Sequence, residues 1–183
     1  SASALLGLNA EQMGSLTAAQ IGALGTAQIA GLAASQVAGL STAAVVALSS
    51  TQIGQLSAAQ VAAMSNAQLA AIETADIKSL STAALRQLSA EQVAGMGTAQ
   101  LTAFTTAQAA ALTTAQLNGL DTAHLNALGS AQFVAFTSAQ VAGLTADQVA
   151  KLETADLAAL GTAALKGLGV DAMALLSTAQ VAA

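Results

Sequence analysis

Large apolar residues recur every eight residues along the whole chain. One series begins at Leu8 and Leu16 and continues without a slip to Leu176, and a second series runs in step with it from Leu5 to Val181. The chain is one octapeptide, approximately Ser/Thr-Thr/Ala-Ala-Gln-Val-Ala-Ala-Leu, written 22 times and followed by a partial copy. A short internal period of this kind predicts an array of stacked units.

The spacing within the octad distinguishes between types of secondary structure. If the octad positions are numbered 1 to 8, with Leu8 closing the first octad, the apolar residues fall at positions 5 and 8. On one continuous helix the apolar stripe would advance by about 80° per octad and would spiral around the helix. Supercoiling absorbs only mean periods of about 3.5 to 3.67 residues, so we reject one long coiled coil. A β-solenoid with an eight-residue step remains an alternative, although positions 5 and 8 of a strand face opposite sides.

The polar positions predict a helix that restarts in every octad. Position 1 is Ser, Thr, Asn or Asp in 15 of 23 octads, which matches the N-cap preference. Position 4 is Gln in 15 of 23 octads, so that Thr17-Ala18-Ala19-Gln20 has the form of a capping box. Leu16 and Ile21 have the spacing of a hydrophobic staple around that cap. The sequence therefore predicts an all-α solenoid of short capped helices, each of about six residues.

The charged residues and glycines follow the same register. All nine acidic residues lie at positions 1 to 4 and all four basic residues at position 6 or 7, as a helix dipole restarting in every octad favours. Glycine at position 7 suits a left-handed residue that ends the helix, and this prediction applies to Gly31, Gly39, Gly95, Gly119 and Gly143. A helix this short does not persist alone, so we expect packing between neighbouring turns to stabilise the array.

A longer period of five octads is superimposed on the octad. The position-4 glutamine is replaced every 40 residues, at Ala4, Ala44, Ala84, His124 and Ala164. Either blocks of five octads were duplicated together, or five octads complete a whole number of superhelical turns. We favour duplication, and two or three octads per turn are both compatible with the sequence.

Composition excludes several classes of function. The chain is 55% hydrophobic and 7% charged, which argues that it folds. Its net charge of −5 with four basic residues predicts no binding to nucleic acid or anionic lipid, and the lack of cysteine excludes disulfides. Gln and hydroxyl side chains interrupt the uncharged stretch 12–72, so we expect no membrane-spanning segment. We expect residues 1–183 to form a single array excised from a longer protein, extracellular or at the cell surface.

A few residues carry chemistry that deserves separate consideration. His124 is the only imidazole and occupies a glutamine position, where we interpret it as a substitute capping side chain. Two carboxyl pairs have a spacing suited to loose Ca²⁺ binding or to acid–base work in a cleft. We interpret them instead as caps and helix-dipole charges beside Lys78 or Lys151; the pairs are Glu73 with Asp76 and Glu153 with Asp156.

The remaining candidates follow the octad. Three phenylalanines and four methionines occupy apolar positions, and we expect them in the core: Phe104, Phe133, Phe136, Met13, Met64, Met96 and Met173. Rows of hydroxyls such as Thr105, Thr113 and Thr145 have the form of a water-ordering array, but N-capping already accounts for them. The sequence therefore predicts no catalytic, cofactor-binding or metal site, and no enzyme.

Two resemblances complete this picture. The run Leu-Thr-Thr-Ala-Gln-Leu at 112–117 resembles the Thr-Ala-Gln octads of very large repetitive bacterial surface or secreted proteins. The run Leu-Thr-Ala-Asp-Gln-Val at 144–149 is similar to the opening of a TAL-effector repeat, but the likeness ends after one octad, without a base-reading pair.

The first resemblance implies a structural module, either a rigid spacer, a stalk or a scaffold. The alternative is a binding module or self-assembling array that presents a groove or apolar surface to protein, peptide or lipid. Size-exclusion chromatography distinguishes these hypotheses, because a spacer is expected to be monomeric and a binding or filament-forming array to self-associate.

Overall fold

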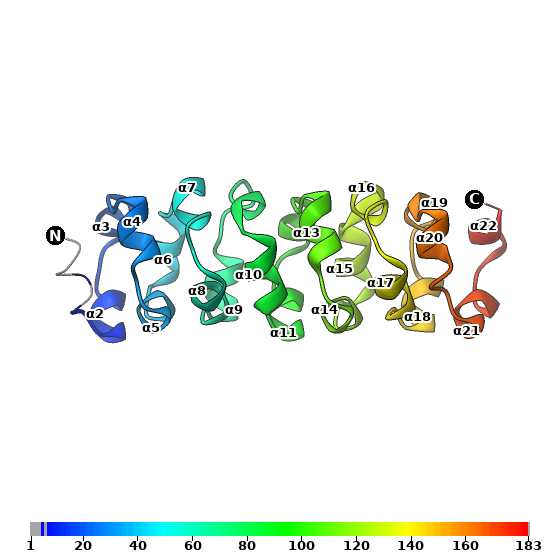
Figure 1. Ribbon diagram of the computed structural model, residues 1–183, viewed down its shortest axis with the longest axis horizontal. Helices are drawn as coiled ribbons and strands as arrows, with labels where there is room; N and C mark the ends of the chain where they lie inside the picture. Colours follow the sequence, from blue (N-terminus) through cyan, green and yellow to red (C-terminus); the bar gives the residue numbers. More distant parts are fainter. Residues whose placement is uncertain (1–4, 6, 183) are drawn as a thin grey trace. The chain divides into compact units, whose positions relative to one another are not determined.

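The computed structural model describes residue 5 and residues 7–182, and all secondary structure in them is helical (Figure 1). From the second octad onward each octad forms one helix of three to six residues, without a strand in the described residues. The prediction of an all-α solenoid with one short helix per octad is confirmed, and the β-solenoid alternative is not supported. The chain divides into two compact units, Ser1–Met96 and Gly97–Ala183, which are described separately.

The first unit contains ten α-helices and one 3₁₀ helix in the part that the structure describes: α2 (Ala10–Gly14), α3 (Ala18–Gly22), α4 (Thr26–Ala30), α5 (Ala34–Ala38), α6 (Thr42–Val46), α7 (Ser50–Ile53), α8 (Ala58–Ala62), α9 (Asn66–Ala70), η1 (Ile77–Ser79), α10 (Thr82–Gln87) and α11 (Ala90–Ala94). The second unit contains eleven α-helices over residues 97–182: α12 (Thr98–Thr102), α13 (Thr106–Ala111), α14 (Thr114–Asn118), α15 (Thr122–Ala127), α16 (Gly129–Phe133), α17 (Ser138–Ala142), α18 (Ala146–Ala150), α19 (Thr154–Ala159), α20 (Thr162–Leu165), α21 (Val170–Ala174) and α22 (Thr178–Val181).

Capping boxes start most of these helices, as predicted. In α8 the cap Ser57 is extended, with φ −69° and ψ 160°, and its hydroxyl accepts the amide of Gln60 at 3.2 Å. The Gln60 Oε1 atom in turn accepts the amide of Ser57 at 2.6 Å. This reciprocal pair satisfies two main-chain donors that a helix start leaves without partners.

Helices pack against the helix three octads away within each unit. In the first unit α3 contacts α6 and α5 contacts α8, and in the second unit α12 contacts α15 and α16 contacts α19. About three octads therefore complete one turn, which is one of the two values compatible with the sequence. Five octads do not make a whole number of such turns, and this supports duplication as the origin of the 40-residue period.

The core of each unit consists of the residues at octad positions 5 and 8. Ile29 and Val61 are 0% exposed at position 5, and Leu32 and Leu56 at position 8 are 5% and 4% exposed. The same holds in the second unit, where Leu117 is fully buried. Alanines at the other positions leave room for the turns to approach closely.

The prediction that position-7 glycines end helices in the left-handed conformation is wrong. The five glycines concerned have φ between −81° and −74°. The chain instead leaves each helix through extended residues, such as the next cap Ser41 with φ −69° and ψ 156°. Gly39 is explained by packing, because a Cβ atom there would lie 2.2 Å from the Ala10 carbonyl oxygen of α2. Among described residues only Gly129, at position 1, has a positive φ, of 62°.

One octad departs from the α-helix. The tenth octad forms the 3₁₀ helix η1, although the twentieth octad begins with the same four residues and forms α19. The two octads differ next at Ile77, Lys78 and Ser79, where the twentieth has Leu, Ala and Ala. Leucine and alanine have higher helix propensities than isoleucine and serine, which explains the difference.

Candidate functional site

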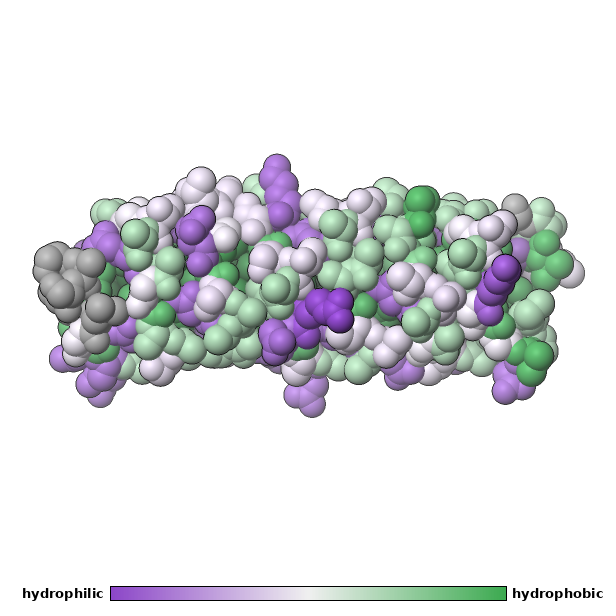
Figure 2. Space-filling model, in the orientation of Figure 1, coloured by the Kyte–Doolittle hydropathy of each residue, from purple (hydrophilic) through white to green (hydrophobic). Residues whose placement is uncertain are grey.

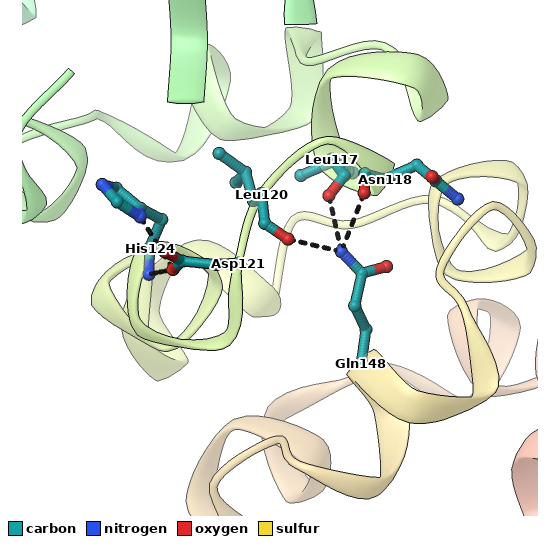
Figure 3. Close-up of polar contacts among 6 residues, drawn as sticks. All are labelled: Leu117, Asn118, Leu120, Asp121, His124 and Gln148. Atoms are coloured by element: carbon teal, nitrogen blue, oxygen red, sulfur yellow. Dashed lines mark hydrogen bonds and ion pairs between the residues drawn. The ribbon is translucent and has the colours of Figure 1, made fainter. Parts of the chain in front are cut away.

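The most developed polar arrangement of the molecule is built by the position-4 glutamines. Gln148 is 7% exposed, and its Oε1 atom accepts the amide of the cap Thr145 at 2.9 Å. Its Nε2 atom donates to the carbonyls of Leu117 at 3.0 Å, Leu120 at 2.8 Å and Asn118 at 3.3 Å (Figure 3). One side chain thus caps its own helix and binds the main chain four octads earlier.

We call this arrangement the glutamine ladder, defined as the position-4 glutamines whose Nε2 atom donates to main-chain carbonyls about four octads earlier. In seven of them the acceptors lie 28 and 31 residues earlier: Gln36, Gln52, Gln60, Gln68, Gln140, Gln148 and Gln180. Gln92 and Gln132 reach carbonyls 28 and 30 residues earlier. The ladder therefore recurs in both units.

The sequence prediction assigned these glutamines only the capping half of this role. The signal for the other half was the absence of Glu at position 4. Glu serves a capping box as well as Gln, because both offer an acceptor to the cap amide. Only Gln also carries donors, and those donors are what the carbonyls of the preceding turn require.

A second set of lateral bonds occurs in the second unit. The side chains of Thr102, Asn118 and Asn126 donate to main-chain carbonyls 25 residues later, at 2.9, 3.0 and 3.2 Å. The donors occupy position 6 and the acceptors position 7, three octads on. These contacts join the same pairs of neighbouring turns as the helix packing.

The two carboxyl pairs are divided by the structure. Glu73 and Glu153 are exposed, whereas Asp76 and Asp156 occupy glutamine positions and are 6% and 2% exposed. The interpretation of both members as surface dipole charges is therefore wrong for the aspartates. The proposed neighbour Lys151 instead pairs with Asp147 at 2.8 Å.

Each buried aspartate is bonded to a serine 26 residues earlier. The Ser50 hydroxyl donates to Asp76, and the Ser130 hydroxyl donates to Asp156 at 2.9 Å. The second oxygen of Asp156 is buried without a partner in the described residues. Burial raises the pKa of Asp156, and the Glu153 charge adds to this while the Ser130 bond opposes it.

His124 is held by its own helix cap. Its main-chain amide donates to the Asp121 carboxylate at 2.9 Å, and its Nδ1 atom lies 2.7 Å from the same oxygen (Figure 3). The His124 amide, followed by its side chain, lowers the pKa of Asp121. The imidazole therefore bonds to the side chain of the cap, where a glutamine would bond to the amide of the cap.

The apolar candidates are mostly core residues, as predicted. Phe104, Phe133 and Phe136 are buried, and the last two rings pack with centroids 4.7 Å apart. Met13, Met64 and Met96 are also buried. The prediction is wrong for Met173, which is 56% exposed in α21.

The hydroxyl row consists of helix caps. Thr105, Thr113 and Thr145 each accept the amide of the glutamine three residues later, at 3.1 to 3.2 Å. In the part of the chain that the structure describes, no group of three or more His, Cys, Asp or Glu residues is placed to hold a metal ion. None of the helices in that part has the length and apolarity that crossing a membrane requires.

Comparison with known proteins agrees with this architecture. The family model described as the ALTTAQ repeat matches residues 34–66, 69–106, 117–152 and 149–183, which together make up more than half of the chain. The hexapeptide of that description occurs literally at Ala111–Gln116. No curated protein matches the chain.

Proposed function

The chain belongs to the ALTTAQ repeat family, and on that premise we propose that it is a non-enzymatic structural module, serving as a rigid spacer, stalk or scaffold. The observation that carries this proposal is the glutamine ladder. It binds the cap of each helix and the main chain of an earlier turn through the same side chain, as Gln60 and Gln148 do. Repetition of one such unit fixes each turn to the next along each unit.

The chemistry-bearing residues support the same proposal. His124 contacts its own cap, and Asp76 and Asp156 contact serines of a neighbouring turn. An enzyme reading requires different polar side chains that converge on a cleft and break the repeat. The polar groups of the described residues instead follow the octad register.

We propose in addition that the module works within a large bacterial surface or secreted protein. The Thr-Ala-Gln octads at 112–117 and elsewhere support this, through their likeness to such proteins. Labelling of unpermeabilised cells with an antibody raised against the chain tests this location. Labelling that appears only after permeabilisation contradicts it.

Small-angle X-ray scattering of the intact chain at low concentration tests the spacer function. A compact globule of this length has a radius of gyration of about 16 Å. A spacer requires a value well above that, together with a scattering profile of rod-like form. A value near 16 Å with a globular profile contradicts the proposal.

A further inference from the structure

The C-terminal end of the second unit exposes an apolar surface. A cavity of about 400 Å³ lies among α19 to α22, lined by side chains that include Leu157, Leu165, Leu168, Met173, Leu176 and Val181. Val181 is 70% exposed and Met173 is 56% exposed, whereas the equivalent position-5 residues in the middle of the unit are buried. Strongly hydrophobic surface is visible where α21 and α22 lie (Figure 2, right).

This surface is more apolar than the repeat requires. Val170 at position 2 is the only large apolar residue at that position in any octad, and it is 81% exposed. Leu175 at position 7 is likewise the only large apolar residue at its position, and it is 55% exposed. Both substitutions add apolar area to positions that are small or polar elsewhere. An exposed cluster of this kind marks an interaction surface.

The N-terminal end of the first unit differs in kind. Met13 and Ile21 at position 5 are fully buried there. Gln12 and Gln20 are exposed, and their Oε1 atoms accept the cap amides of Asn9 and Thr17 at 2.9 and 2.8 Å. Their Nε2 atoms donate to no carbonyl in the described residues, because an acceptor 28 residues earlier would precede residue 1. This end therefore presents amide donors without ladder acceptors.

The C-terminal end presents the matching acceptors. In the ladder the acceptors are the carbonyls at positions 5 and 8, and Ile29 O accepts both the Leu32 amide and Gln60 Nε2. The equivalent carbonyls of α20 and α21 belong to Leu165, Leu168, Met173 and Leu176, and no later octad of the described chain supplies a glutamine to them. The same four residues line the apolar cavity.

We propose that the C-terminal face, formed by α19 to α22, binds the N-terminal face of a second copy of this chain. The incoming Gln12 continues the ladder onto the Leu165 and Leu168 carbonyls, and Gln20 continues it onto those of Met173 and Leu176. The apolar side chains of α20 to α22 are covered by the incoming turn, as in each internal turn. Such a contact joins unlike faces, so each copy keeps a free end and the assembly is open-ended.

This inference does not depend on the proposed function. A chain that is a spacer on its own becomes a longer spacer when copies join end to end. Self-association in size-exclusion chromatography therefore no longer distinguishes a spacer from a binding array, and variants that block one end are needed.

Sedimentation velocity of the intact chain over a range of concentrations tests the proposal. The expected result is growth from monomer through dimer to longer species, with little change on adding NaCl because apolar burial drives the contact. Met173→Glu places a charge on the C-terminal face, and Gln12→Glu with Gln20→Glu removes the donors of the N-terminal face. Both changes keep the capping boxes, because Glu still accepts the cap amide.

Each blocked variant alone is expected to be monomeric, with at least a tenfold weaker apparent association. An equimolar mixture of the two retains one intact C-terminal face and one intact N-terminal face, so it is expected to form dimers and nothing longer. Val181→Glu serves as a second block of the C-terminal face. Circular dichroism confirms that each variant is folded before its association is compared.

Matched controls lie on exposed positions away from the two ends. Val134→Glu introduces a charge at a 64% exposed valine of the second unit, and Gln55→Glu changes an exposed glutamine outside the ladder. Both are expected to associate like the unchanged chain. The proposal is overturned if the unchanged chain stays monomeric at millimolar concentration, if Val134→Glu abolishes association, or if the mixture grows beyond dimers.

Discussion

At the residue scale, the position-4 glutamine combines a local and a distant contact in one side chain. Gln60 is 2% exposed and uses Oε1 for the cap of its own helix and Nε2 for the carbonyls of Ile29 and Leu32. Both contacts satisfy main-chain groups that would otherwise be buried without partners. An octad therefore depends on this residue both for its start and for its attachment to the preceding turn.

Replacing Gln60 by glutamate separates these two roles. The variant keeps an acceptor for the Ser57 amide but faces two carbonyls with a carboxylate, so we expect unfolding free energy to fall by about 1–3 kcal/mol. Urea unfolding followed by circular dichroism measures this loss. Gln12→Glu is the matched control, because Gln12 has no ladder acceptor, and it is expected to change stability by less than about 0.5 kcal/mol. Equal losses for the two variants would show that the ladder bond contributes nothing.

The buried Asp156 gives stability a particular dependence on pH. Its folded pKa lies above the ordinary value of 3.8, because burial disfavours the charged form. The carboxyl therefore favours folding fully below pH 3.8, and this contribution is lost as pH rises through the folded pKa. Asp156→Asn keeps the acceptor for Ser130 and removes the charge. We expect a higher melting temperature for this variant at pH 7 and convergence with the unchanged chain below pH 3.8.

Melting curves from pH 3 to pH 8 measure this difference. The Asp121 carboxyl has a lowered pKa and so acts in the opposite direction, but it is present in both chains and cancels. Asp171→Asn is the control, because Asp171 is exposed. A constant difference between Asp156→Asn and the unchanged chain at every pH would contradict the burial of an ionised carboxyl.

At the scale of the helix, the turns touch at glycines as well as through side-chain bonds. A Cβ atom on Gly39 would lie 2.2 Å from the carbonyl oxygen of Ala10, and one on Gly167 would lie equally close to that of Ser138. In both pairs a position-7 residue approaches position 2 of the helix three octads earlier. Glycine here is a requirement of packing between turns.

Gly39→Ala is expected to lower the unfolding free energy by about 1–3 kcal/mol, because α2 and α5 would have to separate. Gly31→Ala is the matched control at the same octad position, where Ala47 already adopts nearly the same φ and ψ. We expect the control to be neutral or to stabilise by up to about 1 kcal/mol, through the entropy of the unfolded chain. Thermal unfolding of both variants checks this, and a loss of stability in Gly31→Ala would contradict the packing explanation.

The helix is also the level that the sequence predicts best. Ser57 and Gln60 lie three residues apart, so the cap, the helix and its polarity follow from local chemistry alone. The partners across turns lie 25 to 31 residues away, and nearly identical octads offer no means of choosing among them. For the same reason the burial of Asp76 and Asp156 was not predicted. The left-handed glycines were predicted wrongly, because the extended cap that follows already redirects the chain.

At the scale of the whole molecule, stability is expected to vary along each unit. An array held by contacts between neighbouring turns frays where those contacts are incomplete. Helices α2 to α4 lack ladder acceptors, while α8 and α9 have them through Gln60 and Gln68. At low concentration, hydrogen exchange followed by mass spectrometry should therefore be faster in α2 to α4 than in α8 and α9. Uniform exchange across these helices would contradict this gradient.

The serine–aspartate pairs have a consequence for how such an array changes length during evolution. The ladder depends only on relative position, so recombination that adds or removes a whole octad leaves each remaining glutamine with an equivalent carbonyl. Ser130 and Asp156, however, must stay 26 residues apart. An octad inserted between them would bury a carboxylate without its hydroxyl donor. Copy number is thus free to drift along most of the array and is fixed locally wherever an aspartate has replaced the glutamine.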